Sequence, residues 1–299
     1  MEKFKIYFLK LLKKLKLSKY FNFTFLKTVN NIKVKVPIWG NIGLVNMVLD
    51  RDWLDLLIEK FAISNNDKTL YTFVDVGVNI GQTLLRLKTI DPEVKYLGFE
   101  PNSICTSYAQ KLIRANKFRN CIIQNVALST KVDILVLEKT GNADPRASLI
   151  SELRPNCFSE KENVLALDYD SFYLDEKITF VKVDVEGAEY DVLKGMGKAI
   201  IKHQPIITCE VLDSHNAETL KFTQERATQL CEMLKSWNYN VIRLHTASST
   251  ITGFNKVDSI SIVQWTQESY NFNDYLFYPI SQENMVIEKL NLIMKKNNK

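Results

Sequence analysis

Cysteine is scarce in this sequence and is not arranged in pairs. The 299 residues contain five cysteines, an odd number, with no Cys-x-x-Cys motif. Cys121 and Cys209 fall in apolar, strand-like runs, where a free cysteine behaves as a small core residue. The sequence therefore predicts no disulfide framework, and we expect the reducing environment of a cytoplasmic protein.

Long apolar runs are also missing, as are segments rich in glycine or proline. No stretch approaches the roughly 20 apolar residues that a membrane-spanning helix requires. Ten glycines and seven prolines argue against low complexity, and 46% hydrophobic residues suffice for a sizeable core. These values predict one large α/β domain with extensions, or two modest domains.

Positive charge is concentrated at the start of the chain. The net charge is +5, but residues 1–20 carry +6, which leaves a nearly neutral body. Apolar residues spaced by three and four over residues 1–17 predict an amphipathic helix. We favour packing of this helix on the domain or a partner; the alternative is peripheral contact with an anionic membrane surface, at its inner face. The neutral body argues against nucleic-acid binding.

The rest of the chain alternates between strand-like and helix-like segments. A hairpin over residues 21–36 is expected to turn at Asn30-Asn31, and a helix over 50–61 to be N-capped by Asp50. An extra strand is expected at 132–137, and residues 141–162 read as an irregular loop over the site. The main strands are expected at 71–76, 94–99, 121–125, 179–184, 206–211, 241–244 and 260–265. The main helices are expected at 82–89, 103–116, 188–201, 223–237 and 282–294.

This alternation predicts a mostly parallel sheet with helices on both faces. Four segments are expected: a basic amphipathic helix (1–20), a cap with a hairpin and a helix (21–66), a cofactor-binding domain (67–270) and a C-terminal helical tail (271–299).

The stretch VDVGVNIGQ, residues 74–82, joins a strand to a helix through a glycine loop. Such a loop exposes backbone N–H groups to a ligand, and Gly77 and Gly81 impose no Cβ there. Glu100 ends the next strand, where a carboxylate accepts hydrogen bonds from ribose hydroxyls. The spacing does not fit G-x-G-x-x-G, and Asp75 is placed to meet a cationic amino-acid group. S-adenosylmethionine carries both an ammonium group and a ribose, and therefore suits this loop better than a dinucleotide.

Further motifs follow in order: GFEPN (98–102), NVALS (125–129), KVDVEGAEYDVLKG (182–195) and ITCEV (207–211). With VDVGVNIGQ they resemble the FkbM family of S-adenosylmethionine-dependent methyltransferases over about residues 73–211. The resemblance implies a class I methyltransferase fold, Rossmann-like, with a seven-stranded sheet. It also implies a cofactor site, with the methionine end at the glycine loop, the ribose at the FEPN motif and the adenine at the NVALS motif. Its residues are Asp75, Gly77, Asn79, Gly81, Glu100, Asn102, Asn125, Val126 and Ala127.

Methyl transfer to a hydroxyl needs a base, because an alcohol is a poor nucleophile until its proton leaves. Asp184, Glu186 and Glu210 stand at the ends of neighbouring predicted strands, and Lys182 lies two residues before Asp184. We favour Asp184 as the site carboxylate and Glu186 as its partner. His215 is a weaker candidate for a second base, since lone histidines are more often ordinary polar residues.

The expected function is therefore O-methylation of a hydroxyl on a sugar, glycan or related natural product, with no metal. The acceptor class rests on the family resemblance alone. Two alternatives stay open: a nicotinamide-dependent oxidoreductase on the same type of sheet, and a non-catalytic module that binds the cofactor or docks on a membrane. No feature of the sequence indicates an oligomeric state.

Overall fold

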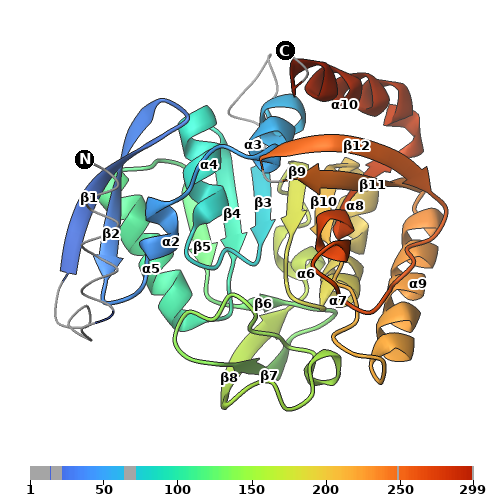
Figure 1. Cartoon of the computed structure of the whole chain (residues 1–299), viewed down its shortest axis with the longest axis horizontal. Helices are drawn as coiled ribbons and strands as arrows, with labels where there is room; N and C mark the ends of the chain where they lie inside the picture. The colour runs from blue at the N-terminus through green and yellow to red at the C-terminus, as the bar shows by residue number, and fades with distance from the viewer. Residues whose placement is uncertain (1–13, 15–21, 64–71, 248, 298–299) are drawn as a thin grey trace.

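An eight-stranded sheet forms the centre of the protein, as a computed structural model shows (Figure 1). The structure describes residues 14, 22–63, 72–247 and 249–297. The strand order is β12-β11-β13-β10-β9-β3-β4-β5. The strands are β3 (Thr72–Val76), β4 (Lys95–Phe99), β5 (Cys121–Gln124), β9 (Ile178–Val183), β10 (Ile206–Glu210), β11 (Tyr239–Ala247), β12 (Thr250–Val257) and β13 (Asp274–Pro279).

The sheet is mostly parallel, as the sequence predicts. Strands β5, β4, β3, β9 and β10 run in one direction. Strand β13 is antiparallel to both β10 and β11, and β12 is antiparallel to β11. The predicted mixed α/β class is confirmed, although β12 adds an eighth strand to the seven expected.

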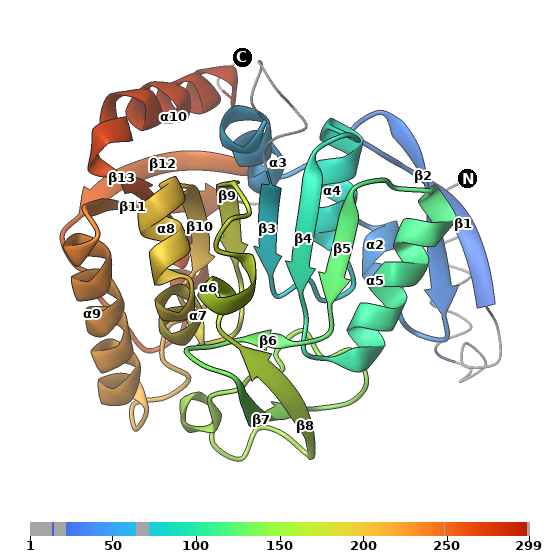
Figure 2. The ribbon, with the colours of Figure 1, turned by 180° about the vertical axis from the view of Figure 1, so that it is seen from behind.

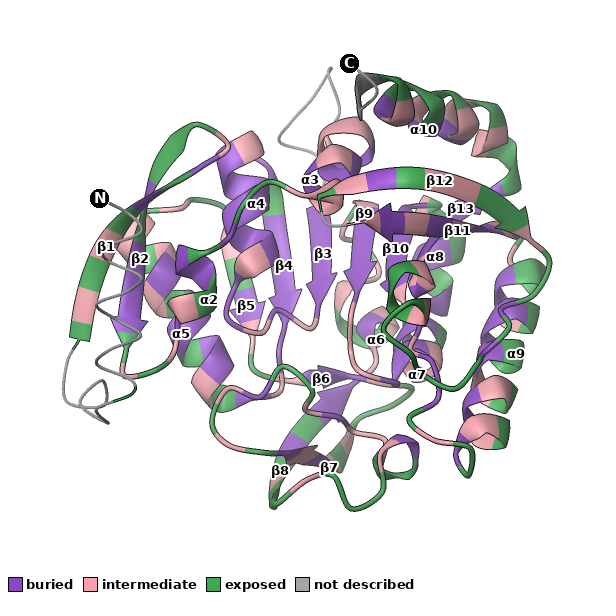
Figure 3. Ribbon diagram, in the orientation of Figure 1, coloured by how far each residue is buried: buried purple, intermediate pink, exposed green. Residues whose placement is uncertain are grey.

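Helices cover both faces because neighbouring strand residues point to opposite sides. Phe73 belongs to one hydrophobic core and Val74 to the other, and the central strands are buried on both faces (Figure 3). The first core is covered by α2 (Leu44–Met47), α3 (Trp53–Leu57), the π-helical turn η2 (Ile58–Ala62), α4 (Gln82–Ile90), α5 (Ser103–Asn116) and α10 (Glu283–Asn297). The second is covered by α6 (Tyr169–Tyr173), α7 (Glu189–Gly195), α8 (Gly197–His203) and α9 (Leu220–Ser236), which Figure 2 shows from behind.

The predicted N-terminal hairpin is confirmed. Strands β1 (Asn22–Val29) and β2 (Ile32–Trp39) pair antiparallel through Asn30 and Asn31, whose φ angles are 47° and 65°. Positive φ at both central residues is what a tight type I′ turn requires, and asparagine tolerates it. The hairpin is fixed to α5 by Asn116, whose side chain exchanges two hydrogen bonds with the backbone of Lys35.

A second, three-stranded sheet lies beyond the carboxyl ends of β3 and β4 (Figures 1 and 2). Its strands are β6 (Ala127–Leu128), β8 (Glu160–Leu167) and β7 (Asp133–Lys139), in that spatial order. The extra strand expected at 132–137 is confirmed as β7. Strand β8 was not predicted, and it begins inside the stretch expected to be irregular.

The strand expected at 260–265 is wrong. Ile260 and Ile262 are buried, but the backbone between them bonds to a side chain rather than to a strand. Gln224 on α9 donates to the Ile260 carbonyl oxygen at 2.9 Å and accepts from the Ile262 N–H at 2.8 Å. The seventh strand is instead β13, which falls within the segment expected to be a helical tail.

Two helices also differ from expectation. The helix predicted over 188–201 is divided into α7 and α8 at Met196, between two glycines. The helix predicted from Asp50 begins at Trp53, because Asp52 is the N-cap and forms a reciprocal capping box with Asp55.

The basic segment 1–20, apart from Lys14, and the boundary expected at residues 66 and 67 lie outside the described residues. Among the described helices, none is long and apolar enough to cross a membrane.

Candidate functional site

A cavity of about 900 Å³ opens where β3, β4, β9 and β10 end. In an open parallel sheet, this edge is where ligands bind. Its wall contains the weaker candidate His215 and nine of the thirteen main candidates from the sequence: Gly77, Asn79, Glu100, Val126, Ala127, Lys182, Asp184, Glu186 and Glu210. The other four, Asp75, Gly81, Asn102 and Asn125, are not part of this wall and support it from behind.

Glycine is required at the end of β3. Gly77 has a φ of +87°, and a Cβ atom there would lie 1.8 Å from the carbonyl oxygen of Asp184. Its N–H donates to the carbonyl oxygen of Phe99 at 3.0 Å, which ties the loop to the end of β4. Gly81 has a φ of +77° and begins α4. The glycines thus bring two strand ends and a helix together at the cavity.

Glu100 is held rigidly at the end of β4. Its two carboxylate oxygens accept from the backbone N–H groups of Asn79 at 2.7 Å and Asn102 at 2.8 Å. Burial raises the pKa of Glu100 to about 7, although these two hydrogen bonds act to lower it. The side chain of Asn102 caps α5 by accepting from the N–H of Ile104 at 3.0 Å. Asn102 therefore positions Glu100 from outside the cavity.

Asp75 does not reach the cavity, contrary to the contact expected with a cationic ligand. Its side chain is fully buried, accepts from the hydroxyl of Tyr96 at 2.6 Å and forms an ion pair with Lys182 at 3.4 Å. Burial raises the pKa of Asp75, and the charge of Lys182 opposes that shift. The carboxylate therefore acts on the cavity only through Lys182.

The NVALS segment contributes backbone support and an apolar wall. Asn125 donates to the carbonyl oxygens of Glu100 at 2.9 Å and Pro101 at 3.0 Å. Val126, Ala127 and Leu128 then line the cavity. Asn125 thus fixes the loop, and the three apolar residues after it form the surface.

Lys182 bridges the glycine loop at the end of β3 and the carboxylate of Asp184 after β9. Its ammonium group donates to the carbonyl oxygen of Gly77 at 2.9 Å and lies 3.1 Å from the carboxylate of Asp184. Burial alone would lower the pKa of Lys182, but Asp184 and Asp75 together raise it above its ordinary value. Lys182 is therefore a permanent cation between the glycine loop and the carboxylates.

Two carboxylates oppose each other on β10 and β13. Glu210 and Asp274 are direct cross-strand partners in the antiparallel ladder, and both line the cavity. Burial raises the pKa of Glu210 well above its ordinary value, and the charges of Asp184 and Asp274 add to this shift. Burial also raises the pKa of Asp274 to about 7. The negative charge of Asp274 thus disfavours ionisation of Glu210.

Asp274 was missed from the sequence because β13 was assigned to the wrong segment. In ISIVQW at 260–265, Ser261 separates two isoleucines as in a half-buried strand, whereas DYLFYP at 274–279 has no such spacing. Only the register of β13 against β10 places Asp274 beside Glu210.

Glu186 is bonded to the loop between β7 and β8 (residues 140–159), which lines part of the cavity. Its carboxylate forms an ion pair with Arg154 at 2.7 Å, and its carbonyl oxygen accepts from the Ser148 hydroxyl at 2.7 Å. Burial raises the pKa of Glu186 to about 7, against the opposing charge of Arg154. Its φ of +55° is unusual for a residue other than glycine. The loop was expected over the site, but Arg154 carries no motif and was missed.

His215 lies in the cavity wall in contact with the same loop. Its Nε2 atom is 3.4 Å from the sulfur of Cys157, which belongs to the loop. The exposed residues Trp265 and Tyr270 also line the cavity. The cavity wall therefore contains aromatic rings as well as acids.

No group of three acidic, histidine or cysteine side chains among the described residues is arranged to hold a metal ion.

Comparison with known families gives a match between residues 75–241 and the methyltransferase FkbM domain. This match covers more than half of the chain and contains every motif from Asp75 to Val211. The chain belongs to the FkbM methyltransferase family. The membership predicted from VDVGVNIGQ and the motifs that follow it is confirmed.

The chain is also similar to a curated methyltransferase and to solved methyltransferase structures. "Methyltransferase sdnD" from Sordaria araneosa is 28% identical, over 41% of this chain and 59% of that protein. The crystal structure of an FkbM methyltransferase from Methylobacillus flagellatus is 16% identical, with a TM-score of 0.45, over 76% of this chain and 48% of that one. An S-adenosylmethionine-dependent O-methyltransferase from Thermotoga maritima is 11% identical, with a TM-score of 0.39, over 85% of this chain and 76% of that one. This FkbM chain thus spans 59% and 48% of the first two relatives.

Proposed function

We propose that this chain transfers the methyl group of S-adenosylmethionine to a hydroxyl group of a sugar, a glycan or a related natural product. The observation that carries the proposal is the Glu210–Asp274 pair. It faces the same cavity as Glu100, which two backbone N–H groups hold at the end of β4. One side of the cavity is suited to a nucleoside, and the other to an acceptor that must lose a proton.

The cavity wall fits the proposed cofactor. Glu100 keeps lone pairs for ribose hydroxyls after accepting its two backbone hydrogen bonds. Val126 and Ala127 offer an apolar surface for adenine, while Gly77 and Asn79 border the methionine end. When bound there, S-adenosylmethionine supplies a methyl carbon that is electrophilic because it is attached to a sulfonium.

The Glu210–Asp274 pair is our choice for the base. A general base works best when its pKa is near the working pH, and burial brings the pKa of Asp274 to about 7. The negative charges of Asp184 and Asp274 raise the pKa of Glu210 further. Asp274, ionised above its pKa of about 7, is then the member of the pair that takes the hydroxyl proton.

Asp184 has a different role from the one favoured at first. Because Lys182 neutralises Asp184 at 3.1 Å, we propose that this carboxylate orients the acceptor hydroxyl rather than removing its proton. Glu186 is tied to Arg154 at 2.7 Å, and we propose that it holds the loop closed against water. Near-attack positioning of this kind supplies much of the rate in methyl transfer.

The acceptor side suits a polyhydroxylated molecule. Carboxylates accept hydrogen bonds from hydroxyls, and Asp184, Glu210 and Asp274 lie together in the wall. Trp265 and Tyr270 add exposed aromatic rings to the same wall, and such rings suit the less polar face of a sugar.

The test measures binding and turnover separately. Glu210→Gln and Asp274→Asn are compared with Glu218→Gln, an exposed residue that is not part of the cavity wall. Binding of S-adenosylhomocysteine is measured by calorimetry, and methyl transfer by release of S-adenosylhomocysteine over a panel of mono- and oligosaccharides. We expect the two cavity variants to bind normally and to lose roughly 10²–10⁴ in kcat, while the control keeps its rate.

Three outcomes would contradict the proposal. Failure of the folded native chain to bind S-adenosylhomocysteine would remove the cofactor, and protection by NAD instead would favour the oxidoreductase alternative. Binding without turnover on any hydroxyl acceptor would favour a non-catalytic module. Full activity in both cavity variants would exclude the carboxyl pair as the base.

A further inference from the structure

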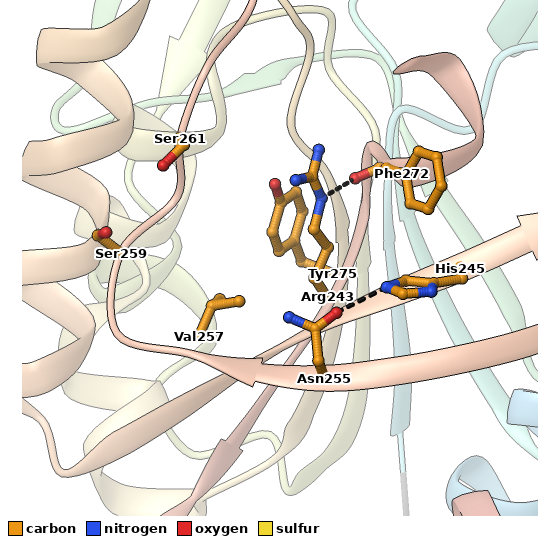
Figure 4. A pocket seen from close by; sticks show the side chains of 8 residues that line it. All are labelled: Arg243, His245, Asn255, Val257, Ser259, Ser261, Phe272 and Tyr275. Carbon is orange, nitrogen blue, oxygen red and sulfur yellow. Dashed lines mark hydrogen bonds between the residues drawn. The ribbon is translucent and has the colours of Figure 1, made fainter. Parts of the chain in front are cut away.

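A second cavity, of about 310 Å³, shares no wall residue with the first. Its walls come from β11, β12, the segment after β12, the 3₁₀ turn η4 (Ser269–Phe272) and the start of β13. They are formed by Arg243, His245, Asn255, Val257, Ser259, Ser261, Phe272 and Tyr275 (Figure 4). This volume is at the lower end of the range for small-molecule sites.

Arg243 is fixed in place but retains donors. Its Nε–H donates to the carbonyl oxygen of Phe272 at 2.7 Å. The centre of its guanidinium group lies 5.5 Å from the ring of Phe272 and 5.7 Å from the ring of Tyr275. Within the described part of the chain, its two terminal nitrogens have no hydrogen-bond partner and no ion pair. A guanidinium held by one nitrogen and two rings is oriented before any ligand arrives.

The other residues of this wall include hydrogen-bond donors, and none of them is acidic. Asn255 has its side-chain oxygen occupied by the Nε2 atom of His245 at 2.6 Å, so its amide NH₂ remains available (Figure 4). Ser259 and Ser261 lie on the segment across the cavity from Arg243, and both are exposed (Figure 4). No aspartate or glutamate belongs to this wall. The wall of the first cavity is rich in acids, whereas the wall of this one contains Arg243 and no acid.

From this arrangement we propose that the second cavity binds a small oxyanion, a phosphate or carboxylate group. The planar fork of an arginine matches two oxygens of such a group and forms short charge-assisted hydrogen bonds. The serine hydroxyls and the Asn255 amide supply donors for the remaining oxygens. Aromatic rings on two sides exclude part of the water, which strengthens the ion pair.

The cavity has room for a small organic molecule as well as for a free ion. The oxyanion can therefore be free phosphate or a group on such a molecule. The experiment separates these sources. Inorganic phosphate, phenyl phosphate and acetate are titrated against the full chain, each at an ionic strength held constant with sodium chloride. Binding of the two phosphates is followed by ³¹P NMR line width, and that of acetate by the shift of its methyl proton resonance.

Arg243→Gln removes the charge, and Arg119→Gln is the matched control on an exposed residue remote from this wall. We expect saturable phosphate binding in the native chain and the control, and a loss of at least 10-fold in affinity in Arg243→Gln. Tighter binding of phenyl phosphate than of inorganic phosphate would assign the site to an organic phosphate. The reverse order would assign it to the free ion, and preference for acetate to a carboxylate.

Arg243 also holds the carbonyl of Phe272, so a second variant guards against a general loss of structure. Ser259→Ala combined with Ser261→Ala leaves Arg243 unchanged and should weaken phosphate binding by roughly 3-fold or more. Absence of saturable binding in the native chain would overturn the proposal, as would equal affinities in Arg243→Gln and Arg119→Gln. Because the readout is anion binding, neither result depends on the proposed methyl transfer.

Discussion

Replacement of Lys182 by methionine should destabilise the protein far more than loss of an ordinary ion pair. Asp75 is fully buried, and Lys182 is the cation beside it. Without Lys182, the carboxylate would keep the Tyr96 hydroxyl at 2.6 Å and lose its charge partner. Breaking a buried pair by removing one member costs about 3–5 kcal/mol. At roughly 2–4 °C per kcal/mol, the melting temperature should fall on the order of 10 °C.

Lys202→Met provides the matched control. Lys202 lies 2.6 Å from Asp175, closer than Lys182 lies to Asp75, but the Asp175 side chain is 96% exposed. Exposed pairs are screened by water and salt, so we expect little change in melting temperature. Both variants replace the lysine of an ion pair by methionine. The difference between their melting temperatures therefore reports the effect of burying the pair.

The pH dependence gives a stricter test of the same reasoning. Burial already raises the pKa of Asp75, and removal of Lys182 should raise it further. When the folded state raises the pKa of a carboxyl group, the folded state binds more protons than the unfolded state. The free energy of unfolding therefore falls as the pH rises from the unfolded pKa through the folded pKa. The deficit of Lys182→Met should thus be larger at pH 8 than at pH 5, as urea unfolding would show. The double variant Asp75→Asn with Lys182→Met should recover stability and lose this pH dependence.

Equal losses in the two lysine variants would refute the buried pair as the cause. So would a double variant that is no more stable than Lys182→Met alone.

Three further predictions follow from the same site. Gly77→Ala should lower the free energy of unfolding by more than the about 1–2 kcal/mol of backbone strain, because its Cβ would lie 1.8 Å from a backbone oxygen. Gly141→Ala, with nearly the same φ (+88°) and nothing within 4 Å, should show the backbone strain alone when both are compared by urea unfolding. Affinity for S-adenosylhomocysteine should rise from pH 6 to pH 8 as Glu100 ionises near its pKa of about 7, and calorimetry on Glu100→Gln should find no such rise. The rate of methyl transfer should increase with pH through the pKa of Asp274, about 7, since a base must be ionised to act; a rate that stays flat from pH 6 to pH 8 would contradict the assignment of the Glu210–Asp274 pair.

The parallel half of the fold could be predicted because its signals are local. Strand β3, the loop at Gly77 and the helix after Gly81 lie within 20 residues of one another, and each step has a residue type that the geometry demands. The hairpin turn at Asn30-Asn31 is local in the same sense, and it was predicted correctly.

The antiparallel edge could not be predicted, because its signals depend on contacts distant in sequence. Ile260 and Ile262 alternate like strand residues, but Gln224, 36 residues earlier, occupies their backbone groups. Strand β13 is buried on both faces, so DYLFYP shows no alternation. The burial of Asp75 could not be predicted for the same reason, because its partners Tyr96 and Lys182 lie on two other strands.

The boundaries of the family match differ from those of the folding unit. Residues 75–241 begin inside β3 and end after the first three residues of β11. They omit β13, which pairs with β10 on one side and β11 on the other. A fragment cut at these boundaries would leave the apolar edge of β10 unpaired, and unpaired edges of this kind aggregate. Recombinant work on related chains should therefore keep the residues through α10, even where similarity to the family has ended.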